Sequence, residues 1–258
     1  MTDAPQDRGT ATAARVGLQI MGFGSTWMLD PGTAAAGEEA GLAGRLFWAC
    51  GRGGVLGDVD ADVVAAEYGF VEPGGFRALW ETRPRTVAPA DAATAYLRAG
   101  AAWGARVLAA ESAEDLTELA VLAERVAAAA SPAIGGLFAG WRAFPVDGLD
   151  PAGRVVRALH VLREHRGCAH LRAVLASGLS PLESILALAE ERGGGPARAQ
   201  RFFWPEPYPD VAHLAGRRAE VEALTDRIAG PAYAVLGDAE VERFAELVGR
   251  VHAAARGV

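Results

Sequence analysis

The sequence predicts an all-α protein, a multi-helix bundle of roughly nine to ten helices in two packed halves. Apolar residues recur at helical spacing, and no alternating apolar and polar pattern runs beyond about four residues. Gly and Pro residues separate the apolar segments at short intervals. We expect a disordered tail over residues 1–12, an N-terminal helical half over 13–145 and a C-terminal helical half over 146–258.

The N-terminal half is expected to consist of helices joined by short loops. The first helix covers residues 11–29 and stops at the turn Asp30–Gly32. Ser112 is the expected N-cap of a later helix, with Asp115 at the capping-box position. The other expected helices cover residues 38–52, 60–69, 73–82 and 89–110, with a short glycine-loosened helix over 131–144.

The C-terminal half is built around a helix over residues 151–177, which we call the motif helix. Asp150 is its expected N-cap, Pro151 occupies its first turn, and Gly178 follows its end. The remaining helices are expected from Ser180, with Pro181 and Glu183 in the first turn, to about residue 192, and over about residues 211–229 and 238–256.

Residues 193–210 are expected to be irregular. The part Phe202–Pro209, "FFWPEPYP", cannot be helical throughout, because proline lacks a backbone N–H. Two interpretations of this aromatic segment stay open: a packed extended connector, or a lid or wall over an apolar pocket.

Composition argues against nucleic acid as a partner. The net charge is -7, whereas nucleic-acid binders usually carry a basic excess or a basic face. All 25 basic residues are Arg, and they are scattered, often beside acidic residues. The absence of Lys and Asn, with abundant Ala and Gly, indicates a GC-rich genome such as that of an actinobacterium.

The chain is expected to be cytoplasmic, without a membrane partner. Its two cysteines, Cys50 and Cys168, lie far apart and form no disulfide framework. Residues 16–29 resemble a signal-peptide core, but Gln19 interrupts them and acidic residues precede them. No apolar run reaches the ~18–20 residues of a transmembrane helix.

The most informative segment is Leu162–Leu171, "LREHRGCAHL", within the motif helix. At about 100° per residue, Arg166 and His170 point to an apolar side of the helix, with Arg163 at its edge. Because unpaired burial of such groups costs several kcal/mol, they must be paired, hydrogen-bonded or beside a wet cavity. Gly167 costs about 1 kcal/mol against Ala and would let another backbone or a ligand approach. The other side carries Glu164, His165, Cys168 and Arg172.

Two interpretations of this polar set stay open. One is a structural ion-pair lattice that ties helices together, with His170 as a satisfied core histidine. The other is a catalytic pocket, since histidine suits proton transfer near neutral pH and arginine suits carboxylate or phosphate. The catalytic candidates are His165 and His170 for proton transfer, Arg166 to position an anion, Glu164 to orient a histidine, and Cys168 as a specificity or nucleophilic position.

No metal site or cofactor is predicted, although a haem or a metal ion is kept as an alternative. His160, Glu164 and Cys168 stand at i, i+4 and i+8 on one flank of the helix, but no second ligand motif accompanies them. The glycine-rich segment Gly51–Gly57 follows a helix and lacks the Lys-Ser/Thr ending of a phosphate loop. We interpret it as a plain loop.

Three segments together resemble a mostly helical actinobacterial family that carries a Leu-Arg-Glu-His-Arg-Gly-Asp-x-His signature. They are "LHVLREHRGCAHLRAVLASGLSPLESILAL" (159–188), "GLAGRLFWACGRGGVLGDVDADVVAAEYGFVEPG" (41–74) and "VEALTDRIAGPAYAVLG" (221–237). The family is usually labelled helix-turn-helix-like, and the resemblance implies no particular activity. It places Trp27 and Tyr68 in recurrent aromatic blocks. The expected ligand-binding residues are Trp27, Trp48, Tyr68 and Arg163.

The chain departs from this pattern at three places. Cys168 stands where the family generally has Asp, and Gly24 aligns with a histidine of the first helix. The winged-helix region is shortened, which puts DNA binding in doubt.

From these observations we expect a small-molecule enzyme of bacterial secondary metabolism. It would use side-chain acid/base chemistry of the lyase, isomerase or cyclase type in a helical-bundle pocket. The alternatives are a ligand-binding regulator related to helix-turn-helix proteins and a haem or metal-binding protein. The expected partner is a small-molecule ligand or substrate, and a homodimer is left open.

Overall fold

The computed structural model describes residues 5–145, 147–190 and 193–257. Every regular element in these residues is a helix, which confirms the all-α class. The α-helices are α1 (Pro5–Met28), α2 (Pro31–Glu39), α3 (Ala61–Tyr68), α4 (Pro73–Glu81), α5 (Pro89–Val107), α6 (Ala113–Ala129), α7 (Gly136–Ala143), α8 (Pro151–Ala176), α9 (Pro181–Leu186), α10 (Gly195–Arg201), α11 (Ala215–Tyr233) and α12 (Asp238–Arg256). A π-helical turn, η1 (Phe47–Gly51), and the short 3₁₀ turns η2 (Gly54–Leu56), η3 (Pro132–Ile134) and η5 (Ala212–Leu214) complete the described elements.

The predicted helix starts are confirmed where a side chain caps them. Ser112 accepts a hydrogen bond from the Asp115 N–H, 3.1 Å away, at the start of α6. Asp150 accepts one from the Gly153 N–H at 2.7 Å and begins α8, the motif helix. Ser180 and Glu183 form the complete capping box of α9.

The helices outnumber the nine to ten that were predicted. The helix expected over residues 38–52 does not form as one piece, because Gly41 and Gly44 adopt φ angles of 72° and 61° and break it. Residues 195–201, expected to be irregular, form α10. The helix expected to run to about residue 192 ends at Leu186.

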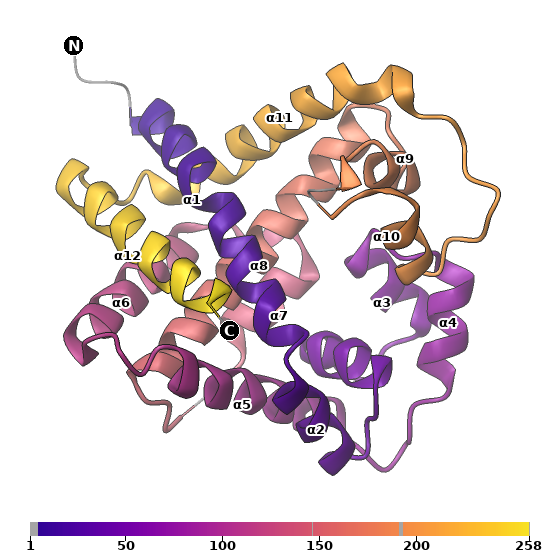
Figure 1. Cartoon of the computed structure of the whole chain (residues 1–258), viewed down its shortest axis with the longest axis horizontal. Helices are drawn as coiled ribbons and strands as arrows, with labels where there is room; N and C mark the ends of the chain where they lie inside the picture. The colour runs from indigo at the N-terminus through magenta and orange to yellow at the C-terminus, as the bar shows by residue number, and fades with distance from the viewer. Residues whose placement is uncertain (1–4, 146, 191–192, 258) are drawn as a thin grey trace.

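The expected disordered tail is wrong for residues 5–12, which belong to α1. Thr12 is buried, and its hydroxyl donates to the Arg8 carbonyl at 2.8 Å. In Figure 1, α1 crosses in front of α8, and it packs against α8, α11 and α12. One apolar core therefore includes residues from Ala13 to Ala255. A domain boundary near residue 146 stays a prediction.

Helix α8 lies at the centre of the bundle and is covered on both faces, by α1 and α11 and by α5, α6 and α7. The short helices α9 and α10 pack against each other, and α9 also contacts α8 (Figure 1). The segment after α10 is tied to the start of α4, because the Glu72 N–H donates to the Phe202 carbonyl at 2.8 Å. In the part of the chain that is described, no helix is both long enough and apolar enough to cross a membrane.

Candidate functional site

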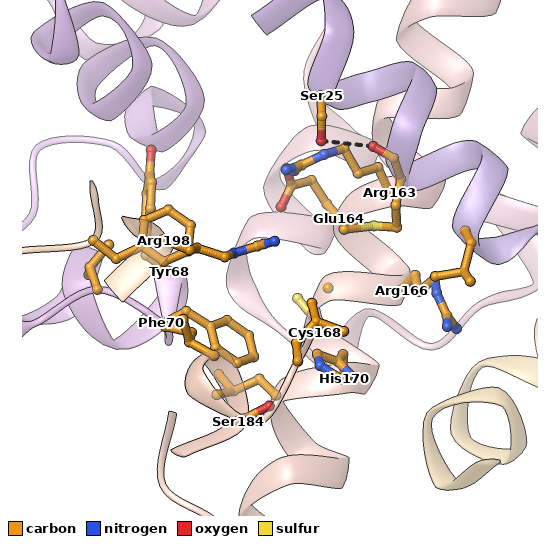
Figure 2. A pocket seen from close by; sticks show the side chains of 18 of the residues that line it. Ser25, Tyr68, Phe70, Arg163, Glu164, Arg166, Cys168, His170, Ser184 and Arg198 are labelled. Carbon is orange, nitrogen blue, oxygen red and sulfur yellow. Dashed lines mark hydrogen bonds and ion pairs between the residues drawn. The ribbon is translucent and has the colours of Figure 1, made fainter. Parts of the chain in front are cut away.

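A cavity of about 460 Å³ lies against the middle of α8. Its volume falls within the ~300–1,000 Å³ of small-molecule sites. Figure 2 shows side chains that meet there from several helices, and we call this space the α8 cavity. Its apolar walls include Leu18 and Met21 of α1, Leu171 of α8, Trp48, Tyr68, Phe70 and Phe202. Its ionisable lining consists of Arg52, Glu67, Arg163, Glu164, Arg166, Cys168, His170, Arg198, Arg218 and Glu222.

Most of the predicted site residues line this cavity. They are Trp48, Tyr68, Arg163, Glu164, Arg166, Cys168 and His170. Two predicted residues do not line it, Trp27 and His165. Trp27 is fully buried, with its ring centroid 4.7 Å from that of Tyr96. His165 lies about 200° around α8 from Arg163 and packs on Phe138, at a centroid distance of 5.0 Å.

Glu164 forms a buried ion-pair cluster with two arginines. Arg52 Nε and Nη2 donate to its two carboxylate oxygens at 2.8 and 2.7 Å, and Arg163 Nη1 donates at 2.9 Å. Burial by itself would raise the pKa of Glu164, but the two arginines lower that pKa to about 2. The nearest histidine nitrogen, Nε2 of His160, is 3.9 Å from Glu164 Oε1 and makes no hydrogen bond. Among the described residues no histidine donates a hydrogen bond to Glu164, so its expected role of orienting a histidine stays a prediction.

Arg52 joins this cluster to the aromatic wall. Its guanidinium lies 4.3 Å from the centre of the Tyr68 ring, a cation–π contact. The Tyr68 hydroxyl lies 3.0 and 2.9 Å from the carbonyls of Trp48 and Ala49, so the ring is held in place. Around Glu164, the ion-pair lattice foreseen from the sequence is therefore present, and it forms one wall of the cavity.

Arg166 is likewise ion-paired, in this case to α11. Its Nη1 donates to Asp226 at 2.7 Å and its Nη2 donates to Glu222 at 2.9 Å. Arg218 forms a further ion pair with Glu222 at 2.6 Å. Helix α1 leaves room for this arrangement, since a Cβ at Gly17 would stand 2.8 Å from Arg166 Nε. Arg166 thus holds α8 to α11 at the edge of the cavity.

His170 has a hydrogen-bond pattern suited to a base. Its Nδ1 is 2.9 Å from the hydroxyl of Thr225, and that hydroxyl donates its hydrogen to the Val221 carbonyl at 2.7 Å. The hydroxyl therefore accepts from Nδ1–H, which leaves Nε2 unprotonated in the neutral ring. Burial lowers the pKa of His170 to about 4, although Glu222 acts in the opposite direction. The ring stacks on Phe70, with centroids 5.6 Å apart.

Cys168 lines the cavity as a protonated thiol. Burial, together with the charge of Glu164, raises its pKa to about 11. A Cβ at Gly135 would collide with its sulfur, so the thiol is closely covered on one side. A thiol of this kind is a poor nucleophile at neutral pH.

Two sequence signals receive a structural explanation. Gly24, where the resemblance led us to expect a histidine, faces Arg163, and a Cβ there would collide with the Arg163 side chain. Gly167 faces open space, since a Cβ there would meet no atom within 4 Å. Because Gly167 also lines the cavity, the space it leaves is available to a ligand rather than to another backbone.

Several site residues were missed from the sequence: Arg52, Phe70, Arg198, Arg218 and Thr225. Phe202 belongs to the aromatic segment for which a wall over a pocket was one interpretation, and it does line the cavity. The same segment is held in place by Trp204, whose indole donates to the Phe70 carbonyl at 2.8 Å. Arg198 could not be assigned to a helix face from the sequence, because its segment was expected to be irregular.

The described residues provide no cluster of ligand side chains for the metal-binding alternative. Among the described residues, no group of three or more His, Cys, Asp and Glu side chains could hold a metal ion. His160 is fully buried against Trp141, at a centroid distance of 4.6 Å. Burial lowers the pKa of His160 to about 3.

The region after α8 has the outline of a helix-turn-helix. Helix α8 is followed by a turn at Ser177–Leu179 and then by α9, which has 6 residues. Ser184 and Ile185 of α9 are buried and line the α8 cavity. Comparison with known families gives a match to the Helix-turn-helix family over residues 14–210, which is most of the chain. Neither the curated proteins nor the solved structures gave a match. The chain belongs to the helix-turn-helix family.

Proposed function

We propose that the protein is an enzyme that binds a small organic molecule in the α8 cavity and uses His170 to move a proton. The observation that carries this proposal is the chain from Val221 through Thr225 to His170. It commits Nδ1 of the imidazole to a hydrogen bond and leaves Nε2 as a proton acceptor on a residue that lines the cavity.

The proton transfer can be written from the groups present. The Nε2 lone pair takes a proton from the substrate, and Nδ1–H keeps its hydrogen bond to Thr225. Glu222 raises the pKa of His170 and so favours the imidazolium that forms. Return of the proton at a second position gives an isomerisation, and loss of a leaving group gives an elimination. Both belong to the lyase, isomerase or cyclase class expected for secondary metabolism.

Space for the substrate is provided by Gly167. It lies within α8 between Arg166 and Cys168, where a helix former would be more stable by about 1 kcal/mol. Its open side supports a cavity built for a ligand rather than for internal packing.

The proposal is tested by proton exchange with solvent. The protein is incubated in D₂O with a filtered metabolite extract of its native host, and mass spectrometry follows compounds that gain deuterium or are converted. The His170→Gln variant should abolish these changes. The His213→Gln variant, at an exposed histidine outside the cavity, should keep them. Equal conversion by the wild-type protein and His170→Gln would rule the proposal out.

A ligand-responsive regulator is the second candidate, supported by membership of the helix-turn-helix family. The observation in its favour is that α9, the helix after the turn, contributes Ser184 and Ile185 to the cavity. A ligand could then shift α9 and change DNA binding. Its test is the DNA-binding experiment given in the Discussion.

A further inference from the structure

The arginines that line the α8 cavity outnumber its carboxylates. The paired arginines at the cavity wall are served by three carboxylates: Glu164 binds Arg52 and Arg163, Glu222 binds Arg166 and Arg218, and Asp226 also binds Arg166. Glu67 is a further carboxylate of the lining, and it accepts a hydrogen bond from the Leu137 N–H. Arg198 is different. Within the described ranges it forms no ion pair, and its Nη1 donates to the Gly193 carbonyl at 3.0 Å. The cavity therefore has a local cationic excess in a protein with a net charge of -7.

The arginines also have donors that no described group satisfies. Nε of Arg218 and Nε of Arg163 are buried without a hydrogen-bond partner among the described residues. Arg218 as a whole is only 8% exposed. Buried donors without partners cost about 1–3 kcal/mol each. A shift of these side chains that brought the donors to the acceptor oxygens of a ligand would offset that cost.

Arg198 points into the middle of this space. Figure 2 shows it extending from α10 into the cavity, toward α8 and Arg163. Its guanidinium carbon lies over the Phe202 ring, 5.3 Å from the ring centre. Burial lowers the pKa of Arg198, and the charges of Arg163, Arg201 and Arg218 lower it further. The positive charges of Arg163 and Arg218 therefore act on Arg198 across the cavity.

The remaining lining is apolar and aromatic. Phe70 stacks on His170, and Trp48 stacks on Phe202 with centroids 6.3 Å apart and an interplanar angle of 11°. Flat side chains on this wall and cations beside them suit a ligand with a planar or apolar body and one anionic group.

We infer that the α8 cavity recognises an organic anion, an aromatic or apolar molecule whose carboxylate or phosphate is held by Arg198 together with Arg163 and Arg218. The inference rests on the proposed function and names the class of its substrate. Such an anion would lie beside His170 as well, and a negative charge there raises the pKa of an imidazole. Substrate binding would then turn His170 from a weak base into a stronger one near neutral pH.

The test is equilibrium binding of three probes that share one body: 1-naphthoate, 1-naphthyl phosphate and neutral 1-naphthamide. Calorimetry or naphthyl fluorescence measures each affinity for the wild-type protein, Arg198→Gln and Arg201→Gln. Arg201 is the matched control, because it lies on α10, is exposed and is not part of the cavity lining. The two variants change the net charge equally.

At least one anion should bind the wild-type protein about tenfold or more tightly than the amide. Arg198→Gln should remove that preference, whereas Arg201→Gln should keep it. The tighter-binding of the two anions, 1-naphthoate or 1-naphthyl phosphate, identifies whether the site recognises a carboxylate or a phosphate. Equal binding of acid and amide, no binding of either anion at millimolar concentration, or equal effects of the two variants would each overturn the inference.

This outcome is independent of the catalytic proposal. His170→Gln should lose deuterium exchange while it keeps its preference for the anion. If the wild-type protein binds the anion but shows no deuterium exchange, the catalytic proposal is rejected and the anion-binding inference is kept. If deuterium exchange depends on His170 but the anions bind no better than the amide, the anion-binding inference is rejected and the catalytic proposal is kept.

Discussion

Nδ1 of His170 on α8 lies 2.9 Å from Oγ1 of Thr225 on α11. Thr225 is fully buried, and its hydroxyl hydrogen is already donated to the Val221 carbonyl. A single threonine therefore decides which nitrogen of the histidine carries the proton. The ring nitrogen that remains free is the one a substrate can use.

Replacing Thr225 by Val should allow His170 to carry its proton on either ring nitrogen. The variant is nearly isosteric, but it leaves Nδ1–H of His170 without its acceptor, at a cost of about 1–3 kcal/mol in unfolding free energy. Long-range ¹H–¹⁵N NMR spectra should show one tautomer of His170 in the wild-type protein and a mixture in Thr225→Val. An unchanged single tautomer in the variant would contradict the assignment.

Gly167→Ala should raise stability and weaken ligand binding at the same time. A Cβ at Gly167 meets no atom within 4 Å, so the helix gains about 0.5–1 kcal/mol from the better helix former. The same methyl group enters the cavity and should weaken naphthoate binding. Gly249→Ala is the control, because Gly249 lies in α12, also faces open space and does not line the cavity. It should raise the melting temperature with unchanged binding.

Acid should destabilise the protein through His165. Burial lowers its folded pKa from 6.5 to about 4, so between these values the unfolded chain binds a proton that the folded protein excludes. The contribution is complete above about pH 6.5 and is lost as the pH falls to about 4, on the order of 3 kcal/mol. Calorimetric melting temperatures should show a smaller acid slope for His165→Gln. An identical slope would mean that His165 does not titrate in this window.

Cys168 should react slowly with alkylating reagents. Its pKa of about 11 leaves little thiolate at pH 7.5, and the side chain is buried. Mass spectrometry should find the thiol largely unmodified after exposure of the folded protein to iodoacetamide. Cys168→Ser should keep any activity within a few-fold. Rapid, substrate-protectable alkylation that abolishes activity would instead assign Cys168 a covalent role.

Specific binding to duplex DNA is not expected. Helix α9 has only 6 residues, carries no Arg, and turns Ser184 and Ile185 into the cavity, while the net charge is -7. Selection from a random DNA library at physiological salt should enrich no sequence. A complex with sub-micromolar Kd for an enriched sequence would favour the regulator, above all if naphthoate changed that affinity.

Three helix starts that the sequence predicted correctly are set by local chemistry, although the start of α2, which Asp30 caps, was missed. Ser112, Asp150 and Ser180 cap their helices because the capping hydrogen bond reaches only two or three residues along the chain. Ends that depend on distant contacts were missed. Helix α10 is the example, since the segment that follows it is held by the Glu72 N–H and the Phe70 carbonyl.

The sequence alone determined the all-α class and the motif helix with its excess of buried ionisable groups. Helical periodicity shows which residues share a face of one helix, but not what covers that face. Only the tertiary structure decided that His170 and Cys168 face a cavity while His165 packs on Phe138. It also decided that Arg52 and Arg198, from segments far apart in the chain, meet α8 there. The ion pairs and the shape of the cavity depend on contacts between helices that are far apart in the sequence. Local patterns in a single sequence do not show which helices come into contact.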